Sequence, residues 1–288
     1  MSMSATEQRV ILVTGANKGI GFHVVKRLLN KSSLDDTLIL FASRDIQRGE
    51  DALQQLGSPT NVRLLQLDMS STESIRQAAN EIKNKYNGQL DVVINNAGIL
   101  AKEVTVDAAR TVFAVNYYGI KLLNELLFPT LRQNGRIINV SSQVGAIQLH
   151  ECSLALQEKY TSPTLTIDEL EQMVKDFLSA VETNSLDDIG YHIKTFNPLY
   201  GISKAALNAL TQIEARQWST EKNLLILSVS PGYCATDMTQ NSTDARPAEY
   251  GADSILHAVY TPANELENGG FYRDGVQLPL ISAPIPKS

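Results

Sequence analysis

Tyr200 and Lys204 are four residues apart, the spacing that places two side chains on one face of an α-helix. A tyrosine hydroxyl is a weak acid at neutral pH, and a cation beside it favours the ionised form and lowers its pKa. Such a tyrosine can exchange a proton with a substrate oxygen. Asn197 and Pro198 precede the pair and are typical of a helix N-cap and first helical position. The sequence therefore predicts an acid, Tyr200, and a tuning lysine, Lys204, in the opening turns of a helix.

Tyr117 and Lys121 have the same spacing, so spacing alone does not identify a reactive pair. Tyr117 lies in the middle of a predicted helix, whereas Tyr200 begins a helix that faces the carboxyl ends of the strands. Ligands of open α/β sheets bind at those ends. We therefore predict that Tyr200 is the reactive tyrosine and that Tyr117 is a packed aromatic residue.

Two serines, Ser141 and Ser142, come at the end of a predicted strand. A hydroxyl group in this place can donate a hydrogen bond to a substrate carbonyl oxygen and polarise the carbonyl. A serine hydrolase is disfavoured, because the sequence has no nucleophile elbow and no histidine with an evident place beside Ser142. Their position alone leaves both serines as candidates.

The segment Thr14–Gly21, with the sequence TGANKGIG, follows an apolar run and opens a helical pattern. Gly15 permits a tight turn, Gly19 lets the backbone approach a pyrophosphate, and Gly21 allows close packing of helix on sheet. The helix N-terminus attracts the phosphates. No Lys-Ser or Lys-Thr pair follows the last glycine, which disfavours a nucleoside triphosphate loop. The segment predicts a dinucleotide site.

The end of the second predicted strand indicates which dinucleotide is bound. A site for NAD commonly has an acidic residue here, but this chain has Arg44. A guanidinium group pairs well with a 2'-phosphate, and Lys18 adds a second cation. Asp45 is interpreted as the N-cap of the next helix. These residues predict NADPH rather than NADH as the cofactor.

Short apolar runs alternate with longer helical patterns along the chain, which is typical of a βαβ array. The predicted strands are Val10–Val13, Leu38–Ala42, Val62–Leu67, Asp91–Ile94, Arg136–Ser141 and Leu224–Ser230. The predicted helices are Ile20–Leu29, Ile46–Leu56, Ser71–Tyr86 and a long stretch around Ala108–Leu131. Because the runs are rich in Val, Ile and Leu without alternation, we expect a mostly parallel sheet with helices on both faces.

An insertion, residues 148–197, interrupts this alternation before the helix of Tyr200. Within it, Thr166 and Glu169 match a capping box. Apolar residues then recur at helical spacing, namely Ile167, Leu170, Val174, Phe177, Leu178 and Val181. We predict one domain over residues 1–288, with an amphipathic helix of the insertion packed on it.

Composition and charge exclude several classes of protein. The 288 residues include 25 Lys plus Arg and 31 Asp plus Glu, and the net charge of -6 gives no general attraction to nucleic acid or an anionic membrane. No apolar run approaches the ~18 residues of a membrane span, and the first residues lack a secretory signal pattern. Two cysteines and four histidines without paired spacing predict no metal and a reducing compartment. We predict a cytoplasmic protein that binds a small molecule.

Further motifs make the chain resemble the short-chain dehydrogenase/reductase superfamily over nearly its whole length. They follow the family's order: Thr14–Gly21, Asn95–Gly98, Asn116, Ser142, Tyr200–Lys204, Pro231–Gly232 and Thr236. The resemblance implies a Rossmann-type, doubly wound, mostly parallel seven-stranded sheet, and it favours Ser142 over Ser141. Lys18, Arg44 and the long separation of Ser142 from Tyr200 are most similar to the monomeric NADPH-dependent carbonyl reductases, so the resemblance also implies a monomer.

The resemblance implies roles for residues that the motifs alone do not explain. Asn116 is similar to a family residue that kinks its helix and holds a water molecule linking Lys204 to solvent. The implied cofactor residues are Gly15, Asn17, Lys18, Gly19, Ile20, Gly21, Arg44, Asp68, Met69, Asn95, Ala97, Gly98, Val115, Tyr200, Lys204, Pro231, Gly232 and Thr236.

Among them, Asp68 would contact adenine, and Asn95 with Ala97 and Gly98 would line the adenine ribose. Thr236 would hydrogen-bond the carboxamide. A mobile substrate loop would follow, carrying Tyr233, Cys234 and Met238.

The expected activity is reduction of an aldehyde, ketone or quinone by NADPH, with Tyr200 as acid, Lys204 as its tuner and Ser142 as polariser. Two other interpretations remain. A nucleotide-sugar epimerase or dehydratase shares the glycine-rich segment and the tyrosine-lysine pair, although such relatives carry a larger C-terminal domain. A regulatory protein could instead bind NADPH without turnover.

Overall fold

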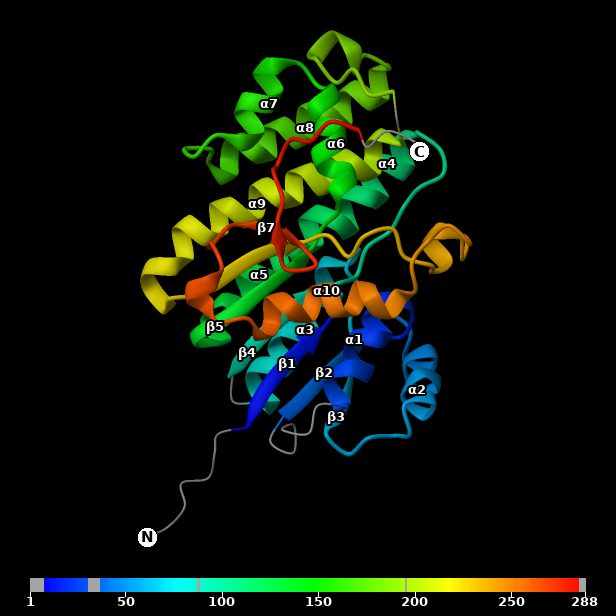
Figure 1. Ribbon diagram of the computed structural model, residues 1–288, viewed down its shortest axis with the longest axis vertical. Helices are drawn as coiled ribbons and strands as arrows, with labels where there is room; N and C mark the ends of the chain where they lie inside the picture. Colours follow the sequence, from blue (N-terminus) through cyan, green and yellow to red (C-terminus); the bar gives the residue numbers. More distant parts are fainter. Residues whose placement is uncertain (1–7, 31–36, 87–88, 195, 285–288) are drawn as a thin grey trace.

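The computed structural model describes residues 8–30, 37–86, 89–194 and 196–284, which form an open sheet between two layers of helices (Figure 1). The strands are β1 (Arg9–Val13), β2 (Thr37–Ser43), β3 (Val62–Gln66), β4 (Leu90–Asn95), β5 (Leu131–Val140), β6 (Leu225–Val229), β7 (Phe271–Arg273) and β8 (Val276–Gln277). Their order across the sheet is β3-β2-β1-β4-β5-β6-β7-β8. This order, with its reversal between β1 and β4, is that of the predicted Rossmann-type, doubly wound sheet.

The sheet has one strand more than the predicted seven. The strands β1 to β7 are parallel, and β8 pairs antiparallel with β7. Asp274 and Gly275 connect the two strands, with φ of 51° and 81°. An Asp-Gly pair with positive φ at both positions is a favoured two-residue hairpin turn, so the sequence contained a signal for β8 that the apolar runs did not.

Two apolar cores, one on each face of the sheet, hold the layers together. On one face lie α1 (Gly19–Leu29), α2 (Ile46–Gln55) and α10 (Ala248–Tyr260). On the other lie α3 (Thr72–Lys85), α4 (Val106–Phe113), α5 (Gly119–Leu127) and α9 (Pro198–Lys222). Every residue of β2 and β6 is buried, as expected for strands that helices cover on both sides.

The stretch around Ala108–Leu131 is not one helix. A π-helical turn, Ala114–Tyr118, separates α4 from α5, and a 3-10 turn, Phe128–Thr130, follows α5. Asn116 lies in the π turn and its side chain bonds to Ile99, outside the helix. Helical periodicity continues through such a turn, so the sequence pattern does not reveal it, and π turns are often found at functional sites.

The insertion begins within α6 (Gln143–Glu151) and contains α7 (Leu154–Thr161), α8 (Ile167–Thr183) and a 3-10 turn (Asp187–Ile189). The predicted capping box is present, because the Thr166 hydroxyl accepts from the backbone of Glu169 and the Glu169 carboxylate accepts from that of Thr166. The predicted apolar face of α8 packs into the core beside α4 and α9. Figure 1 shows α6, α7 and α8 together at one end of the molecule, next to α9.

Candidate active site

Most of the predicted site residues follow the carboxyl ends of β1 to β6 or open the helices that come next, while Asn95 ends β4 and Val115 and Asn116 lie in the π turn. Because these six strands are parallel, those ends lie on one edge of the sheet. The predicted residues therefore gather at one edge although they are distributed from Gly15 to Thr236. Ligand positions in open α/β sheets are expected at this edge, near the reversal of strand order between β1 and β4.

The glycine-rich segment is a tight connection between β1 and α1. Gly15 and Gly19 have φ of 62° and 55°, which L side chains rarely adopt. A Cβ atom on Gly15 would lie 3.0 Å from the backbone of Ala97, and one on Gly21 would collide with the Asn96 side chain and the Gly15 carbonyl. The glycines thus bring the loop and the start of α1 close to the end of β4.

The first turn of α1 fits a phosphate group. Seven of the described helices, α2, α3, α4, α6, α7, α8 and α9, have an N-cap side chain that accepts a hydrogen bond from their first turn. Lys18, the N-cap of α1, makes no such bond. The first N–H groups of α1 are therefore free of a side-chain cap, and the open glycine backbone leaves room for an anion. These features fit the pyrophosphate of the predicted dinucleotide.

Asn96 holds the glycine-rich segment in place, although it was not among the predicted site residues. Its Nδ2 donates to the carbonyls of Thr14, at 2.8 Å, and Gly15, at 3.1 Å. The backbone N–H of Ala97 donates to the Thr14 hydroxyl at 3.0 Å. Asn96 is the first residue beyond β4. Its position directly after a parallel strand was the sequence signal that could have identified it as a site residue.

The Asn95 side chain points into the core rather than toward the predicted adenine ribose position. Asn95 is 0% exposed, and its Nδ2 donates to Asn124 and Asn139 inside the core. Asn95 is still part of β4, so its side chain takes the direction set by the sheet. Ala97 and Gly98 follow the strand and are partly exposed at the site.

The two predicted cations for the 2'-phosphate differ in their surroundings. Arg44 follows β2, is exposed, and has no hydrogen bond or ion pair to any residue that the structure describes. Lys18 forms an ion pair of 2.7 Å with Asp237, and both side chains are largely exposed. Asp45 caps α2 through the backbone N–H of Arg48, as predicted. Arg44 is thus available to an anion, whereas Lys18 already has a partner.

The remaining predicted cofactor residues of the first half of the chain border the same edge. Asp68 is half-buried beyond β3, where its carboxylate accepts from the backbone and hydroxyl of Ser70. Met69 and Val115 are buried, and Asn17 and Ile20 are half-buried.

Tyr200 and Lys204 lie in the first two turns of α9. The Asn197 side chain caps this helix by accepting from the backbone N–H of Leu199 at 2.9 Å, and Pro198 is its first residue, as predicted. Tyr200 is half-buried, while Lys204 is 3% exposed. The Lys204 Nζ donates to the Val140 carbonyl at 2.8 Å and lies 5.8 Å from the centre of the Tyr200 ring.

The pKa values of this pair differ from the prediction. Burial raises the pKa of Tyr200 above its usual value, and hydrogen bonding with the Ser142 hydroxyl opposes the rise. Burial lowers the pKa of Lys204 to about 7. Lys204 does not lower the pKa of Tyr200 as predicted, because the buried ammonium is itself only partly charged at neutral pH and is directed to Val140.

The two adjacent serines point to different places. Ser141 is buried, and its hydroxyl donates to the Lys204 carbonyl at 3.2 Å. Ser142 is half-buried, is the N-cap of α6, and has its hydroxyl close enough to that of Tyr200 to oppose the rise in the tyrosine pKa. The structure brings Ser142, and not Ser141, beside the tyrosine hydroxyl.

Asn116 joins the π turn to α9 and to the end of β4. Its Oδ1 accepts from the backbone N–H of Ile99, and its Nδ2 donates to the Ile99 carbonyl and to Ser203. A Cβ placed on Gly98 would lie 3.5 Å from both the Asn116 Oδ1 and the Lys204 Nζ. Asn116 and Lys204 therefore approach the same small space beside Gly98.

The second tyrosine-lysine pair is directed elsewhere. Tyr117 is 0% exposed, and its hydroxyl has no hydrogen-bond partner among the described residues. Lys121 pairs with Glu125 at 2.7 Å and with Glu171 of α8 at 3.0 Å. Lys121 therefore links α5 to α8. Tyr117 is a packed aromatic residue, as predicted.

The segment after β6 is pinned by Arg246. Its guanidinium donates to the Pro231 carbonyl and pairs with Asp274, and its backbone pairs with that of Tyr233 and Ala235. Gly232 has a φ of 79°. Thr236 lies against the glycine-rich segment, since a Cβ on Gly19 would be 3.3 Å from its Cγ2. This places Thr236 beside the glycine-rich segment.

Of the predicted substrate loop, Tyr233 and Met238 are exposed, but Cys234 is 3% exposed. Its sulfur packs against Gly251 of α10, and burial raises the pKa of the thiol. Cys234 is therefore not an accessible reactive thiol.

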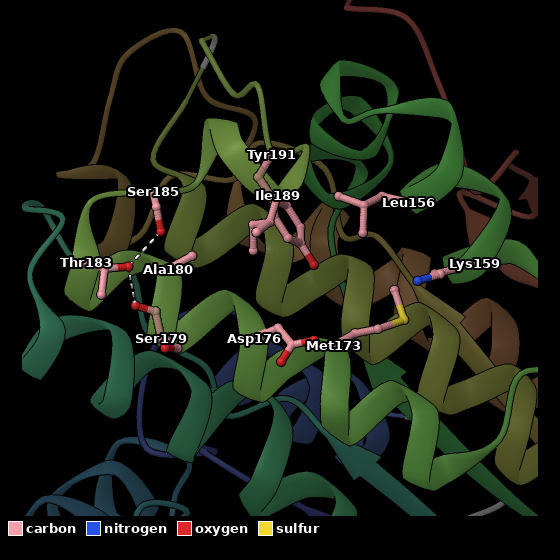
Figure 2. A pocket seen from close by; sticks show the side chains of 10 residues that line it. All are labelled: Leu156, Lys159, Met173, Asp176, Ser179, Ala180, Thr183, Ser185, Ile189 and Tyr191. Atoms are coloured by element: carbon pink, nitrogen blue, oxygen red, sulfur yellow. Dashed lines mark hydrogen bonds between the residues drawn. The ribbon is translucent and has the colours of Figure 1, made fainter.

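A cavity of about 370 Å³ lies away from these residues, within the insertion (Figure 2). Leu156 and Lys159 of α7, residues of α8 such as Met173 and Asp176, and Tyr191 line it. None of the predicted catalytic or cofactor residues contributes to its wall. All of its lining residues lie between Leu156 and Tyr191, so the cavity is formed by the insertion alone. The Tyr191 hydroxyl is hydrogen-bonded to that of Tyr160 at 3.0 Å.

Comparisons with known proteins agree with this fold and edge. The family model for short chain dehydrogenase matches residues 9–154, and that for Enoyl-(Acyl carrier protein) reductase matches residues 143–264. Carbonyl reductase (NADPH) 1 of Mus musculus is 33% identical over 279 residues, which are 94% of this chain and 98% of that protein. Carbonyl reductase (NADPH) 3 of Rattus norvegicus is 33% identical over 277 residues, 93% of this chain and 97% of that protein.

Solved structures show the same architecture. Salutaridine reductase from Papaver somniferum has a TM-score of 0.79 and 27% identity, covering 92% of this chain and 99% of that one. The NADPH-bound carbonyl reductase from chicken fatty liver has a TM-score of 0.68 and 23% identity, covering 96% of each chain. The fold and the matching families define an oxidoreductase with a Rossmann-type sheet. The chain belongs to the short-chain dehydrogenase/reductase family and is similar in sequence to carbonyl reductases.

No helix within the described residues is both long and apolar enough to cross a membrane. The described residues also contain no cluster of three or more His, Cys, Asp or Glu side chains suited to a metal ion. The cytoplasmic location and the absence of a metal remain predictions.

Proposed function

We propose that the protein reduces the carbonyl group of a small molecule with NADPH. The observation that carries this proposal is the convergence of Ser142, Tyr200 and Lys204 at the edge of the sheet where the glycine-rich segment opens α1. The sequence similarity to carbonyl reductases named for NADPH supports it. When bound, NADPH would supply the hydride for the carbonyl carbon.

The protein's own groups would serve the carbonyl oxygen. Ser142 would donate a hydrogen bond that polarises the carbonyl, and Tyr200 would give its proton to the oxygen as charge develops there. The raised pKa of Tyr200 keeps the hydroxyl protonated at neutral pH, which is the form that reduction needs. Lys204 would stabilise the phenolate that results.

The phenolate must regain a proton after each turnover. Lys204, with a pKa lowered to about 7, can give up and take up a proton at neutral pH. Asn116 approaches the same space beside Gly98 and would hold a water molecule there, completing a relay to solvent. The π turn supports this role by fixing the Asn116 side chain against Ile99 and Ser203.

An apolar substrate fits the surroundings of Tyr200. Phe196 is 46% exposed, and its ring lies 6.3 Å from that of Tyr200 in an edge-to-face arrangement. Tyr233 is also exposed, on the loop after β6. Exposed aromatic rings beside a proton donor favour carbonyl compounds with an apolar or aromatic body.

The direct test is NADPH oxidation by the wild-type protein with a panel of aldehydes, α-dicarbonyls, quinones and aryl ketones, repeated with NADH. Turnover with NADPH would support the proposal and begin to define the substrate. Cofactor binding without turnover across the panel would favour a regulatory protein, and turnover of nucleotide sugars would favour that other branch of the family.

Arg44→Ala tests the choice of cofactor. Removing the exposed guanidinium directly after β2 should weaken NADPH binding by about 10-fold to 100-fold, because a charge-assisted contact to the 2'-phosphate is lost. NADH binding should change less than twofold, about the scatter expected when no contact is lost. Fluorescence titration of both cofactors measures this, and equal losses for both would contradict the assignment.

We also propose a monomer in which α8 covers α4 and α9. Light scattering should give a mass near 31.6 kDa, and a mass near twice that value would contradict the proposal.

A further inference from the structure

Glu214 is an ionisable core residue that the proposed chemistry does not use. It lies on α9, is 1% exposed, and its Oε2 accepts a hydrogen bond of 2.9 Å from the Asn124 Nδ2 on α5. Its other oxygen, Oε1, has no hydrogen-bond partner among the described residues. A buried carboxylate anion with so few partners is strongly unfavourable.

The charged groups around Glu214 do not compensate a negative charge. Lys121 on α5 is engaged by Glu125 and by Glu171 of α8. Burial, the largest cause, raises the pKa of Glu214 to about 8. Hydrogen bonding with Asn124 and Asn139 and the charge of Lys121 oppose the rise, and the charge of Glu125 adds to it. The Tyr117 hydroxyl, on the π turn, has its pKa raised mainly by burial, with a smaller contribution from the charge of Glu214, and it is uncharged at neutral pH. Glu214 is therefore the neutral acid at pH 7.

Glu214 ends a chain of buried amides that crosses the sheet. The Asn95 Nδ2 on β4 donates to the Asn124 Oδ1 at 2.7 Å and to the Asn139 Oδ1 on β5 at 2.8 Å. The Asn139 Nδ2 donates to the Thr211 hydroxyl on α9 at 2.9 Å. Asn95 and Asn139 are direct partners in the register of β4 and β5. The chain thus ties two strands to α5 and α9.

Both strands enter the candidate active site immediately beyond these amides. Asn96 follows Asn95 and holds the glycine-rich segment. Val140 follows Asn139, and its carbonyl accepts from Lys204. Each hydrogen bond in this buried chain restricts the relative position of the two elements that it joins.

We propose that Glu214 is a positioning residue, kept as the neutral acid, which through Asn124 and the Asn95–Asn139 pair holds the ends of β4 and β5 in the arrangement that presents Asn96 to the glycine-rich segment and Val140 to Lys204. Its effect on cofactor binding rests on the proposed function. Its protonation state and its effect on the strand ends do not.

The protonation state is tested by urea unfolding of wild type, Glu214→Gln and Glu221→Gln between pH 5 and pH 9.5. The unfolded chain ionises Glu214 at its ordinary pKa, whereas the folded protein keeps the proton up to about pH 8. The unfolding constant of wild type should therefore rise, relative to Glu214→Gln, by about tenfold per pH unit up to pH 8 and then level off. Glu221 is exposed on the same helix, so Glu221→Gln should follow wild type. If the ratio of the unfolding constants of wild type and Glu214→Gln is independent of pH, the inference that Glu214 is a neutral acid is wrong.

The positioning role is tested by amide hydrogen exchange at pH 6.5 with Glu214→Gln and Glu214→Leu. The glutamine accepts from Asn124 as the neutral acid does, so residues 95–98 and 139–142 should keep wild-type protection. The leucine leaves the Asn124 amide without its acceptor, and these segments should exchange at least about tenfold faster, as expected from the loss of a buried hydrogen bond. Wild-type protection in Glu214→Leu would overturn the role.

Two further measurements separate this inference from the proposed function. If Glu214→Leu does not fold, wild type is compared with Glu214→Gln at pH 9, where the ionised Glu214 should speed exchange of the same segments in wild type alone. NADPH titration should show weaker binding for Glu214→Leu and unchanged binding for Glu214→Gln. If wild type binds no NADPH, the proposed function fails, while the exchange and unfolding results still decide the role of Glu214.

Discussion

The chain contains two tyrosine-lysine pairs with identical spacing and opposite surroundings. Tyr200 opens α9 and is half-buried beside Ser142, while Tyr117 is completely buried in the π turn. Lys204 donates to the Val140 carbonyl and has no acidic partner among the described residues, whereas Lys121 is held by Glu125 and Glu171.

The pKa values of the two lysines consequently shift in opposite directions. Burial lowers the pKa of Lys204 to about 7. Burial acts in the same sense on Lys121, but hydrogen bonds to Glu125 and Glu171 outweigh it and raise its pKa. Burial raises the pKa of both tyrosines, so the tyrosines alone do not distinguish the pairs. An accessible hydroxyl with a serine beside it, and a lysine free of carboxylates, are what set the first pair apart.

The sharpest way to break this comparison is to remove each tyrosine hydroxyl. Tyr200→Phe should lower kcat by about 100-fold to 10,000-fold, the range for loss of a general acid. Tyr117→Phe should leave kcat unchanged and alter stability by at most about 1 kcal/mol, because it removes a buried hydroxyl without a partner. Steady-state kinetics of both variants measure this, and a similar loss of kcat in the two would contradict the assignment.

The adjacent serines sharpen the comparison, since only Tyr200 has a serine hydroxyl beside it. Ser142→Ala should lower kcat by about 100-fold or more, as expected when a group that stabilises the developing negative charge is lost. Ser141→Ala should instead lower stability by about 1 kcal/mol, through loss of the bond to the Lys204 carbonyl, with a smaller effect on kcat. Kinetics and urea unfolding of both variants check it. The reverse order of the two kcat values would be evidence against Ser142.

The pH dependence of stability tests the unusual lysine. Between pH 7 and its ordinary pKa of 10.5, Lys204 is neutral in the folded protein and charged in the unfolded chain. The unfolded state therefore binds more protons, and wild type should gain stability relative to Lys204→Met by about 1.4 kcal/mol per pH unit in that range. Below pH 7 the difference should be constant. Urea unfolding from pH 6 to 10.5 measures the stability difference between the two proteins. A difference that does not change with pH would show that burial does not disfavour the charged form of Lys204.

The smallest effect is expected at the other lysine. Lys121→Met removes two ion pairs at the packing of α5 on α8, which should lower stability by about 0.5 to 1 kcal/mol. Turnover and cofactor affinity should stay at wild-type values. Unfolding and kinetics of this variant complete the comparison, and a loss of turnover would link this pair to the site.

The fold was largely predictable because its signals are local in the chain. The apolar runs mark the buried strands, and Thr166 with Glu169 marks the start of α8. The eighth strand and the π turn were missed. A two-residue strand has too few residues for a pattern, and the π turn depends on bonds between Asn116 and Ile99 that sequence periodicity does not report.

Within the candidate site, the order of motifs predicted which residues gather but not where each side chain points. Asn95 was assigned to the cofactor, yet it turns into the core, and the neighbouring Asn96 holds the glycine-rich segment. Lys18 was expected to be a second cation for the 2'-phosphate, and the structure pairs it with Asp237 from the loop after β6. Each of these outcomes depends on a partner far away in the chain.

The sequence by itself determined the family, the parallel sheet and the spacing of Tyr200 and Lys204. These properties depend on apolar runs and glycines whose effect is on the conformation of the chain nearby. Only the tertiary structure decided which tyrosine-lysine pair is accessible, which serine meets Tyr200, and how far burial shifts Lys204 and Glu214. Those properties are set by desolvation and by contacts between elements, and both appear only when the strands and helices are packed together.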